Sequence, residues 1–125
     1  MVIRIQDGSD IPVYHQLRDQ IVAGISDGRL APGEQLPTVR ALAGEIGINA
    51  MTVNKAYQLL KQEGFILIDR RRGARVREIF DTAAELPQEK QALLRQLAAE
   101  AKARGMTRTE FLALCGGAYG EEGAL

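Results

Sequence analysis

The fold of this 125-residue chain is decided by residues 36–76, whose sequence is LPTVRALAGEIGINAMTVNKAYQLLKQEGFILIDRRRGARV. Thr38 precedes apolar residues at helical spacing, so it is predicted to be the N-cap of a helix that ends at Gly47. Asn49 is predicted to cap a second helix, which ends at Gly64. Two short helices joined by a tight turn are typical of a helix-turn-helix.

The second of these helices has two different sides. Its apolar side is expected to face the core and consists of Val53, Ala56, Tyr57 and Leu60. Its other side is expected to point outward and consists of Ala50, Met51, Asn54, Lys55 and Gln58. In a helix-turn-helix the second helix enters the major groove with its N-terminal residues leading. The outward side is therefore a candidate surface for reading DNA, although a helical lysine such as Lys55 is often merely exposed.

A short hairpin follows the second helix. Residues 65–68 form an apolar, strand-like run, residues 69–73 supply the turn, and residues 74–77 alternate like a returning strand. The tip carries Arg70, Arg71 and Arg72, which suit phosphates or a minor groove better than a core. The alternative is a solvated turn, which is the usual role of a charge run. The expected fold class is mainly α with a small β-hairpin wing, that is, a winged helix-turn-helix plus a short C-terminal helical dimerisation region.

The distribution of charge agrees with a nucleic-acid partner, although the net charge of the chain is zero. Residues 38–77 carry eight Lys and Arg against three Asp and Glu, a balance of +5. The balance is −2 for residues 1–37 (three against five) and −3 for residues 78–125 (five against eight). Because a local basic patch attracts phosphate while the global sum mainly affects solubility, the proposed reading unit is the part that binds DNA.

The residues before this unit predict an edge strand, a helix and a turn. Residues 1–6 alternate between apolar and polar and are expected to form a short edge strand. A helix is expected to begin at Pro12, to place Leu17, Ile21 and Ile25 in the core, and to end near Gly28. The pair at positions 32 and 33, Pro-Gly, is typical of a type II turn.

The residues after the hairpin predict a second, smaller region. Residues 78–85 are expected to be a linker, followed by a helix over residues 87–104. Thr107 and Glu110 form a capping box that opens a last helix, whose end is weakened by the glycines at 116 and 117 before a frayed tail over residues 119–125. Two helices are too few to enclose a core, so they are expected to pack on a second copy of the chain. The expected contacts are Leu93, Leu94, Leu97, Ala101, Phe111 and Leu114.

Other functional classes find little support in the sequence. The single histidine, His15, and the single cysteine, Cys115, lack the companions that a metal site or a nucleophile–base pair needs. We therefore expect no enzyme, metal or cofactor. No apolar run reaches the length of a membrane span, and one cysteine cannot build a disulfide framework, so a cytoplasmic protein is expected.

Three spaced motifs resemble the DNA-binding domain of GntR-family bacterial transcription regulators. They are PVYHQL at residues 12–17, GRLAPGEQLPTVR at residues 28–40 and TVNKAY at residues 52–57. The short two-helix tail resembles the YtrA-type subfamily. The resemblance implies a winged helix-turn-helix domain over residues 1–77, a linker and dimerisation region over residues 78–125, and a homodimer that binds a palindromic operator, usually as a repressor.

The resemblance also implies individual DNA contacts. Arg40 matches an arginine that family members place on DNA, although it could instead pair with Glu34 or Glu45. Ala50 and Asn54 stand where the family often has arginine, so Asn54 is expected to pair with adenine, and Ala50 or Met51 to touch a thymine methyl. The complete set of predicted DNA contacts is Thr38, Arg40, Asn49, Ala50, Met51, Thr52, Asn54, Lys55, Gln58, Arg70, Arg71, Arg72 and Gly73.

Two other functions remain open at this point. A winged helix can serve as an adaptor that binds protein rather than DNA, because one fold hosts unrelated functions. The tail could also line a pocket for a small effector, which would make the chain a ligand sensor.

Overall fold

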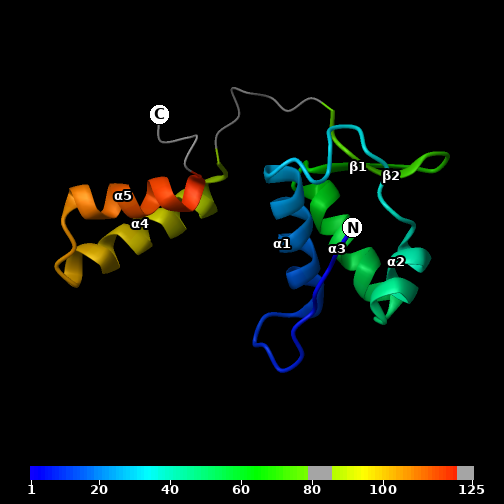
Figure 1. The fold of residues 1–125 in the computed structure, drawn as a ribbon, viewed down its shortest axis with the longest axis horizontal. Coiled ribbons are helices and arrows are strands. Elements are labelled where there is room, and N and C mark those ends of the chain that lie inside the picture. The colour runs from blue at the N-terminus through cyan, green and yellow to red at the C-terminus, as the bar shows by residue number, and fades with distance from the viewer. Residues whose placement is uncertain (79–85, 121–125) are drawn as a thin grey trace. The chain divides into compact units, whose positions relative to one another are not determined.

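The computed structural model describes residues 1–78 and 86–120, which fall in two compact units, Met1–Asp81 and Thr82–Leu125. The first unit contains the helices α1 (Val13–Ser26), α2 (Val39–Ile46) and α3 (Ala50–Gln62) and the strands β1 (Ile66–Asp69) and β2 (Gly73–Val76). The second contains α4 (Gln88–Ala103) and α5 (Arg108–Tyr119). The predicted mainly helical fold with one hairpin is confirmed (Figure 1). Within the described residues, no helix has the length and apolar character needed to cross a membrane.

Helix α1 forms one wall of the core of the first unit. Pro12 is its N-cap rather than its first residue, one position from the prediction. Leu17 and Ile21 are fully buried, and Ile25 packs against the core while remaining half-buried. Helix α1 lies beside α3, as Figure 1 shows, and this pair supports the helix that is expected to read DNA.

The two helices of the helix-turn-helix begin and end where their capping residues predict. The Oγ1 atom of Thr38 accepts a hydrogen bond from the Ala41 N–H at 3.1 Å, and the Oδ1 atom of Asn49 accepts one from the Met51 N–H at 2.8 Å. Between them, Gly47 ends α2 with a φ of 73°, a conformation that costs glycine little. The predicted core face of α3 is buried and consists of Val53, Ala56, Tyr57 and Leu60.

The N-terminal segment departs from the prediction, because residues 1–6 form no strand. Its backbone is held instead by two side-chain amides of α1. The Arg4 N–H donates to Oε1 of Gln20 and the Gln6 N–H donates to Oε1 of Gln16, both at 2.9 Å, and each amide nitrogen donates back to the matching carbonyl oxygen. Arg4 and Gln6 are two residues apart on the extended segment, and their partners in α1 are four residues apart. The helix thus satisfies these backbone groups, and a neighbouring strand is not required for their hydrogen bonds.

The wing contains one more extended segment than the sequence indicates. Strands β1 and β2 are antiparallel, with Asp69 opposite Gly73, and both lie one residue from their predicted ends. Residues 33–36 then line the other edge of β2, because the Leu36 N–H donates to the Ala74 carbonyl and the Val76 N–H donates to the Glu34 carbonyl, each at 2.8 Å. The turn predicted at positions 32 and 33 leads into this segment: the Glu34 N–H donates to the Ala31 carbonyl at 3.0 Å across it, and Gly33 has a φ of 79°.

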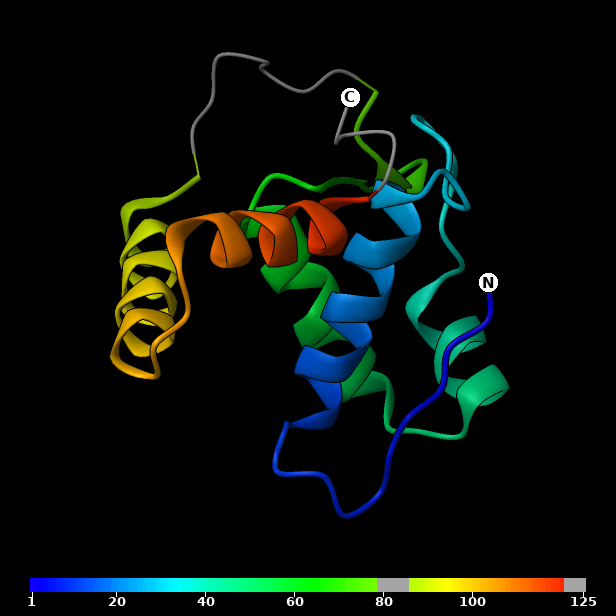
Figure 2. The same ribbon diagram turned by 60° about the vertical axis from the view of Figure 1, so that its left-hand side comes forward.

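The second unit is a pair of helices without a core of its own. The predicted capping box is present: the Glu110 N–H donates to Oγ1 of Thr107, and the Thr107 N–H donates to Oε1 of Glu110. Helix α5 continues through the glycines at 116 and 117 to Tyr119, contrary to the predicted weak end. No residue of α4 or α5 is buried in the single chain, and Figure 2 shows the two helices at a wide angle to each other. Most of the predicted linker (79–85) and the end of the predicted tail (121–125) lie outside the described residues.

Candidate nucleic-acid interface

The outward side of α3 presents both apolar and polar groups to solvent. Met51 is 79% exposed, and Asn54, Lys55 and Gln58 are exposed as well. Ala50 was expected to point outward but is half-buried and packs against the core, because it starts the helix next to the α2–α3 turn. Thr52 is also half-buried. The surface available for base edges is therefore narrower than the sequence predicts.

Two of the predicted DNA contacts already serve as helix caps. The side-chain oxygens of Thr38 and Asn49 accept backbone hydrogen bonds, as described above. Both side chains are exposed, and the Thr38 hydroxyl and the Asn49 amide each retain a hydrogen to donate. They can therefore cap a helix and contact a phosphate at the same time.

Arg40 lies in the first turn of α2 and is exposed. The pairings with Glu34 or Glu45 that the sequence left open do not form within the described residues. Glu34 instead accepts a hydrogen bond from the Ala31 N–H at 3.0 Å. The Arg40 guanidinium is therefore available to an external anion.

Lys55 has a partner inside the first unit. Its Nζ atom lies 4.1 Å from the centre of the Tyr14 ring, within the range of a cation–π contact. Tyr14 belongs to α1 and is half-buried, so this contact links α3 to α1. Lys55 is thereby held toward α1, which supports a structural role beside the predicted DNA contact.

The tip of the wing is held on both sides of its arginines. Asp69 accepts a hydrogen bond from the Arg71 N–H at 2.7 Å, and this bond is the main reason that the pKa of the Asp69 carboxyl is lowered. On the other side, the Nε2 atom of Gln35 donates to the Arg72 carbonyl oxygen at 2.7 Å. The side chains of residues 70–72 are all exposed. A fixed backbone with three exposed guanidinium groups is suited to binding phosphate.

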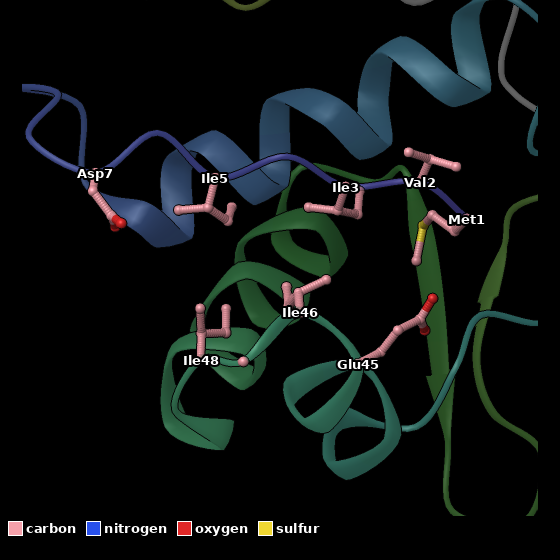
Figure 3. A pocket seen from close by; sticks show the side chains of 9 residues that line it. Met1, Val2, Ile3, Ile5, Asp7, Glu45, Ile46 and Ile48 are labelled. Atoms are coloured by element: carbon pink, nitrogen blue, oxygen red, sulfur yellow. The ribbon is translucent and has the colours of Figure 1, made fainter.

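A groove of about 500 Å³ runs between the N-terminal segment and the α2–α3 turn. Figure 3 shows Ile3 and Ile5 on one side of it and Ile46 and Ile48 on the other. Its charged side chains are the carboxylates of Asp7 and Glu45, and Met1, which carries the N-terminal amino group, lines it as well.

Sequence reasoning missed three glutamines that hold segments of the first unit in place. Gln16 and Gln20 hold the N-terminal segment beside the α2–α3 turn, and Gln35 holds the wing. Gln16 and Gln20 could have been found from their spacing of four residues, which places both on one side of α1, and from the alternating pattern of residues 1–6. Gln35 gave no such signal, because its partner is 37 residues away in the sequence.

Comparisons with known proteins agree with this geometry. A family model described as bacterial regulatory proteins, gntR family, matches residues 13–76. The HTH-type transcriptional regulator Rv1152 of Mycobacterium tuberculosis is 32% identical over 108 residues, which cover 86% of each chain. The chain belongs to the GntR family of bacterial regulators.

Two further similarities indicate the YtrA-like branch of the GntR family. The transcriptional repressor YtrA of Bacillus subtilis is 40% identical over 77 residues, which are 62% of this chain and 59% of that repressor. The solved structure of YtrA from Sulfolobus acidocaldarius, a GntR-family transcription factor, superposes with a TM-score of 0.66 at 38% identity, covering 82% of this chain and 99% of that one. The predicted resemblance is confirmed. This GntR-family chain is a DNA-binding transcription regulator and not an enzyme.

Proposed function

We propose that this GntR-family regulator is a homodimeric repressor that binds a palindromic operator in the cytoplasm. The observation that carries the proposal is that one compact unit holds both an exposed polar helix face and a tip of three exposed arginines. Helix α3 enters the major groove, and the wing reaches the flanking backbone or minor groove.

The contacts divide into those that read bases and those that bind phosphate. Asn54 pairs with adenine and Met51 touches a thymine methyl, because both are exposed on the first turns of α3. The exposed Gln58 lies one turn further along the same side. Phosphates are bound by the wing and by the ends of the two helices. The phosphate contacts are Thr38, Arg40, Asn49, Thr52, Lys55, Arg70, Arg71, Arg72 and the backbone of Gly73.

The homodimer is supported by the apolar surface that the second unit exposes. Leu93, Leu97 and Leu114 are 50%, 50% and 59% exposed. A hollow of about 540 Å³ between α4 and α5, lined in part by Ala101 and Phe111, offers room for apolar side chains of a second copy. Soluble proteins rarely leave such contiguous apolar surface uncovered. Pairing through α4 and α5 buries it and yields two reading helices related by twofold symmetry.

Repression is supported by the branch of the family to which the chain is similar, since YtrA of Bacillus subtilis is named a transcriptional repressor. We infer that the chain represses by occupying a promoter. The dimer is expected to space two half-sites by about 10 bp or a multiple of that length.

The DNA-binding surface is tested with the full chain and a duplex that the chain selects from a random-sequence pool. The double variant Arg40→Ala, Arg72→Ala should bind this duplex at least tenfold more weakly while keeping its unfolding temperature. The control Arg29→Ala, Arg95→Ala removes the same charge, and Arg29 is already paired with Asp27 at 2.8 Å. Equal losses in the two double variants would reject the assigned surface, and a pool that yields no preferred sequence would reject the function.

The dimer is tested by sedimentation of the Leu97→Glu variant, which places a charge on the exposed apolar side of α4. We expect this variant to sediment as a monomer and to lose operator affinity with the dimer. Ala99→Glu is the control, because it adds the same charge about 160° around the helix. A Leu97→Glu variant that still sediments as a dimer would show that the interface lies elsewhere.

A further inference from the structure

We propose that Gln35 is a positioning residue that fixes the arginine tip of the wing for DNA binding. The inference rests on the proposed contact between the wing and DNA. According to this inference, the neutral side chain of Gln35, which lies outside the helix-turn-helix, contributes to the affinity for DNA through the arginines that it positions.

The backbone around Gln35 is part of the wing. Gln35 forms a β-bridge with Arg75, and on either side of it the Leu36 N–H and the Glu34 carbonyl bond to β2 at 2.8 Å. This pairing anchors the Cα atom of Gln35 beside the middle of β2. The origin of its side chain is therefore set by the sheet rather than by a mobile loop.

From that anchored position, the side chain reaches the tip of the hairpin. Its Nε2 atom donates to the Arg72 carbonyl oxygen at 2.7 Å. The same nitrogen lies 3.8 Å from the place where a Cβ atom would stand on Gly73, whose φ is +72°. The Gln35 side chain therefore lies beside Gly73, the first residue of β2, and it holds the carbonyl of the residue before it.

The hydrogen bond completes a restraint that Asp69 begins. Asp69 holds the Arg71 N–H from the β1 side at 2.7 Å, and Gln35 holds the Arg72 carbonyl from the β2 side. In the described part of the chain, no carboxylate forms an ion pair with the guanidinium groups of residues 70–72. The two hydrogen bonds thus restrain the backbone of the tip, while the guanidinium groups of residues 70–72 remain available to an external anion.

This arrangement matters because ordering a loop on binding costs affinity. Three neighbouring arginines also repel one another, which favours alternative conformations of a free tip. A tip that is already ordered loses less conformational entropy when it binds phosphate. A restraint on its backbone should therefore increase the affinity for DNA.

The test is a double-mutant cycle on the full chain with the selected duplex described above. Gln35→Met keeps the length of the side chain but removes its donor, and it should weaken binding about 3- to 10-fold, the range expected for one hydrogen bond. The triple variant Arg70→Ala, Arg71→Ala, Arg72→Ala removes the groups that Gln35 positions. In that background, Gln35→Met should have no further effect.

Two controls separate positioning from a general effect on the fold. Gln62→Met makes the same replacement at an exposed position near the end of α3 and should change neither affinity nor stability. Gln35→Met should lower the unfolding temperature by no more than about 5 °C, the range expected for one hydrogen bond, so that the variant is fully folded at the temperature of the binding assay.

The outcomes distinguish this inference from the proposed function. If the triple variant binds as tightly as the parent chain, the wing contact fails and the role of Gln35 fails with it. If the triple variant is weakened but Gln35→Met has no effect, or has the same effect in both backgrounds, only the positioning role is overturned.

Discussion

The hydroxyl of Tyr57 in α3 donates a hydrogen bond to the carbonyl oxygen of Pro37 at 2.8 Å. Pro37 immediately precedes the N-cap of α2, so this bond joins the helix proposed to read DNA to the start of its partner helix. Tyr57 is 2% exposed, and burial raises the pKa of its hydroxyl above the ordinary value. The group therefore remains protonated, and the bond persists, throughout the physiological pH range.

Replacing Tyr57 with Phe should destabilise the first unit by about 1 kcal/mol, because the Pro37 carbonyl loses its donor while the ring still fills the core. Urea unfolding of the full chain measures the change. The control is Tyr119→Phe, at a position that is 86% exposed, and it should stay within about 0.5 kcal/mol of the parent chain. Equal effects of the two variants would show that the Tyr57 hydroxyl contributes nothing to stability.

The wing tip should respond to acid through Asp69. The hydrogen bond from the Arg71 N–H lowers the pKa of this carboxyl in the folded chain, so its contribution is complete at neutral pH and is lost as the pH falls. The NMR shift of the Arg71 amide should follow this titration with a midpoint below about 4, the ordinary value for aspartate. In Asp69→Asn the titration of this amide should disappear. A midpoint at or above the ordinary value would contradict the assigned bond.

Base-reading and phosphate-binding residues should differ in their response to salt. Arg70→Ala removes one phosphate contact and should reduce the slope of log K against log salt by about 0.9. Met51→Ala should alter the selected sequence and weaken binding without changing that slope, because its exposed side chain carries no charge. Titrations at several salt concentrations measure both effects, and identical slopes for the two variants would contradict the division of roles.

The capping box of α5 should support the proposed dimer. Thr107→Ala removes the acceptor of the Glu110 N–H and should cost each copy of the helix about 1 kcal/mol, which weakens pairing about 30-fold if α5 forms only in the dimer, because both copies lose the cap. Sedimentation equilibrium measures the dissociation constant. Thr109→Ala is the matched control, since Thr109 lies inside the first turn and caps nothing. A dimer that is insensitive to Thr107→Ala would show that the folding of α5 is not coupled to pairing.

The features that the sequence predicts correctly are those governed by local chemistry. Thr38 and Asn49 cap the helices that follow them, and Gly47 takes the left-handed conformation that ends α2. Each of these depends on hydrogen bonds or backbone angles within a few residues. The alternation of apolar residues along α3 likewise identifies the buried side, because its period matches the helix.

The features that escaped prediction depend on contacts between distant residues. An alternating segment indicates a strand, but residues 1–6 are satisfied by Gln16 and Gln20 instead of a neighbouring strand. Ala50 has the position of an outward residue on α3, yet it is half-buried and packs against the core, whose residues come from several elements. Whether Gln35 touches the wing is likewise decided only when residues 33–36 pair with β2.

Residues 33–36 also have a consequence for the operator. They pair with β2 and then continue into Pro37, whose carbonyl is held by Tyr57 of α3. The helix proposed to enter the major groove and the arginine tip are therefore joined by one continuous set of hydrogen bonds, and we expect them to move together. A single base pair inserted between the two tracts that they touch would rotate one tract by about 34° relative to the other, so a half-site should not tolerate that insertion even when every contacted base is retained.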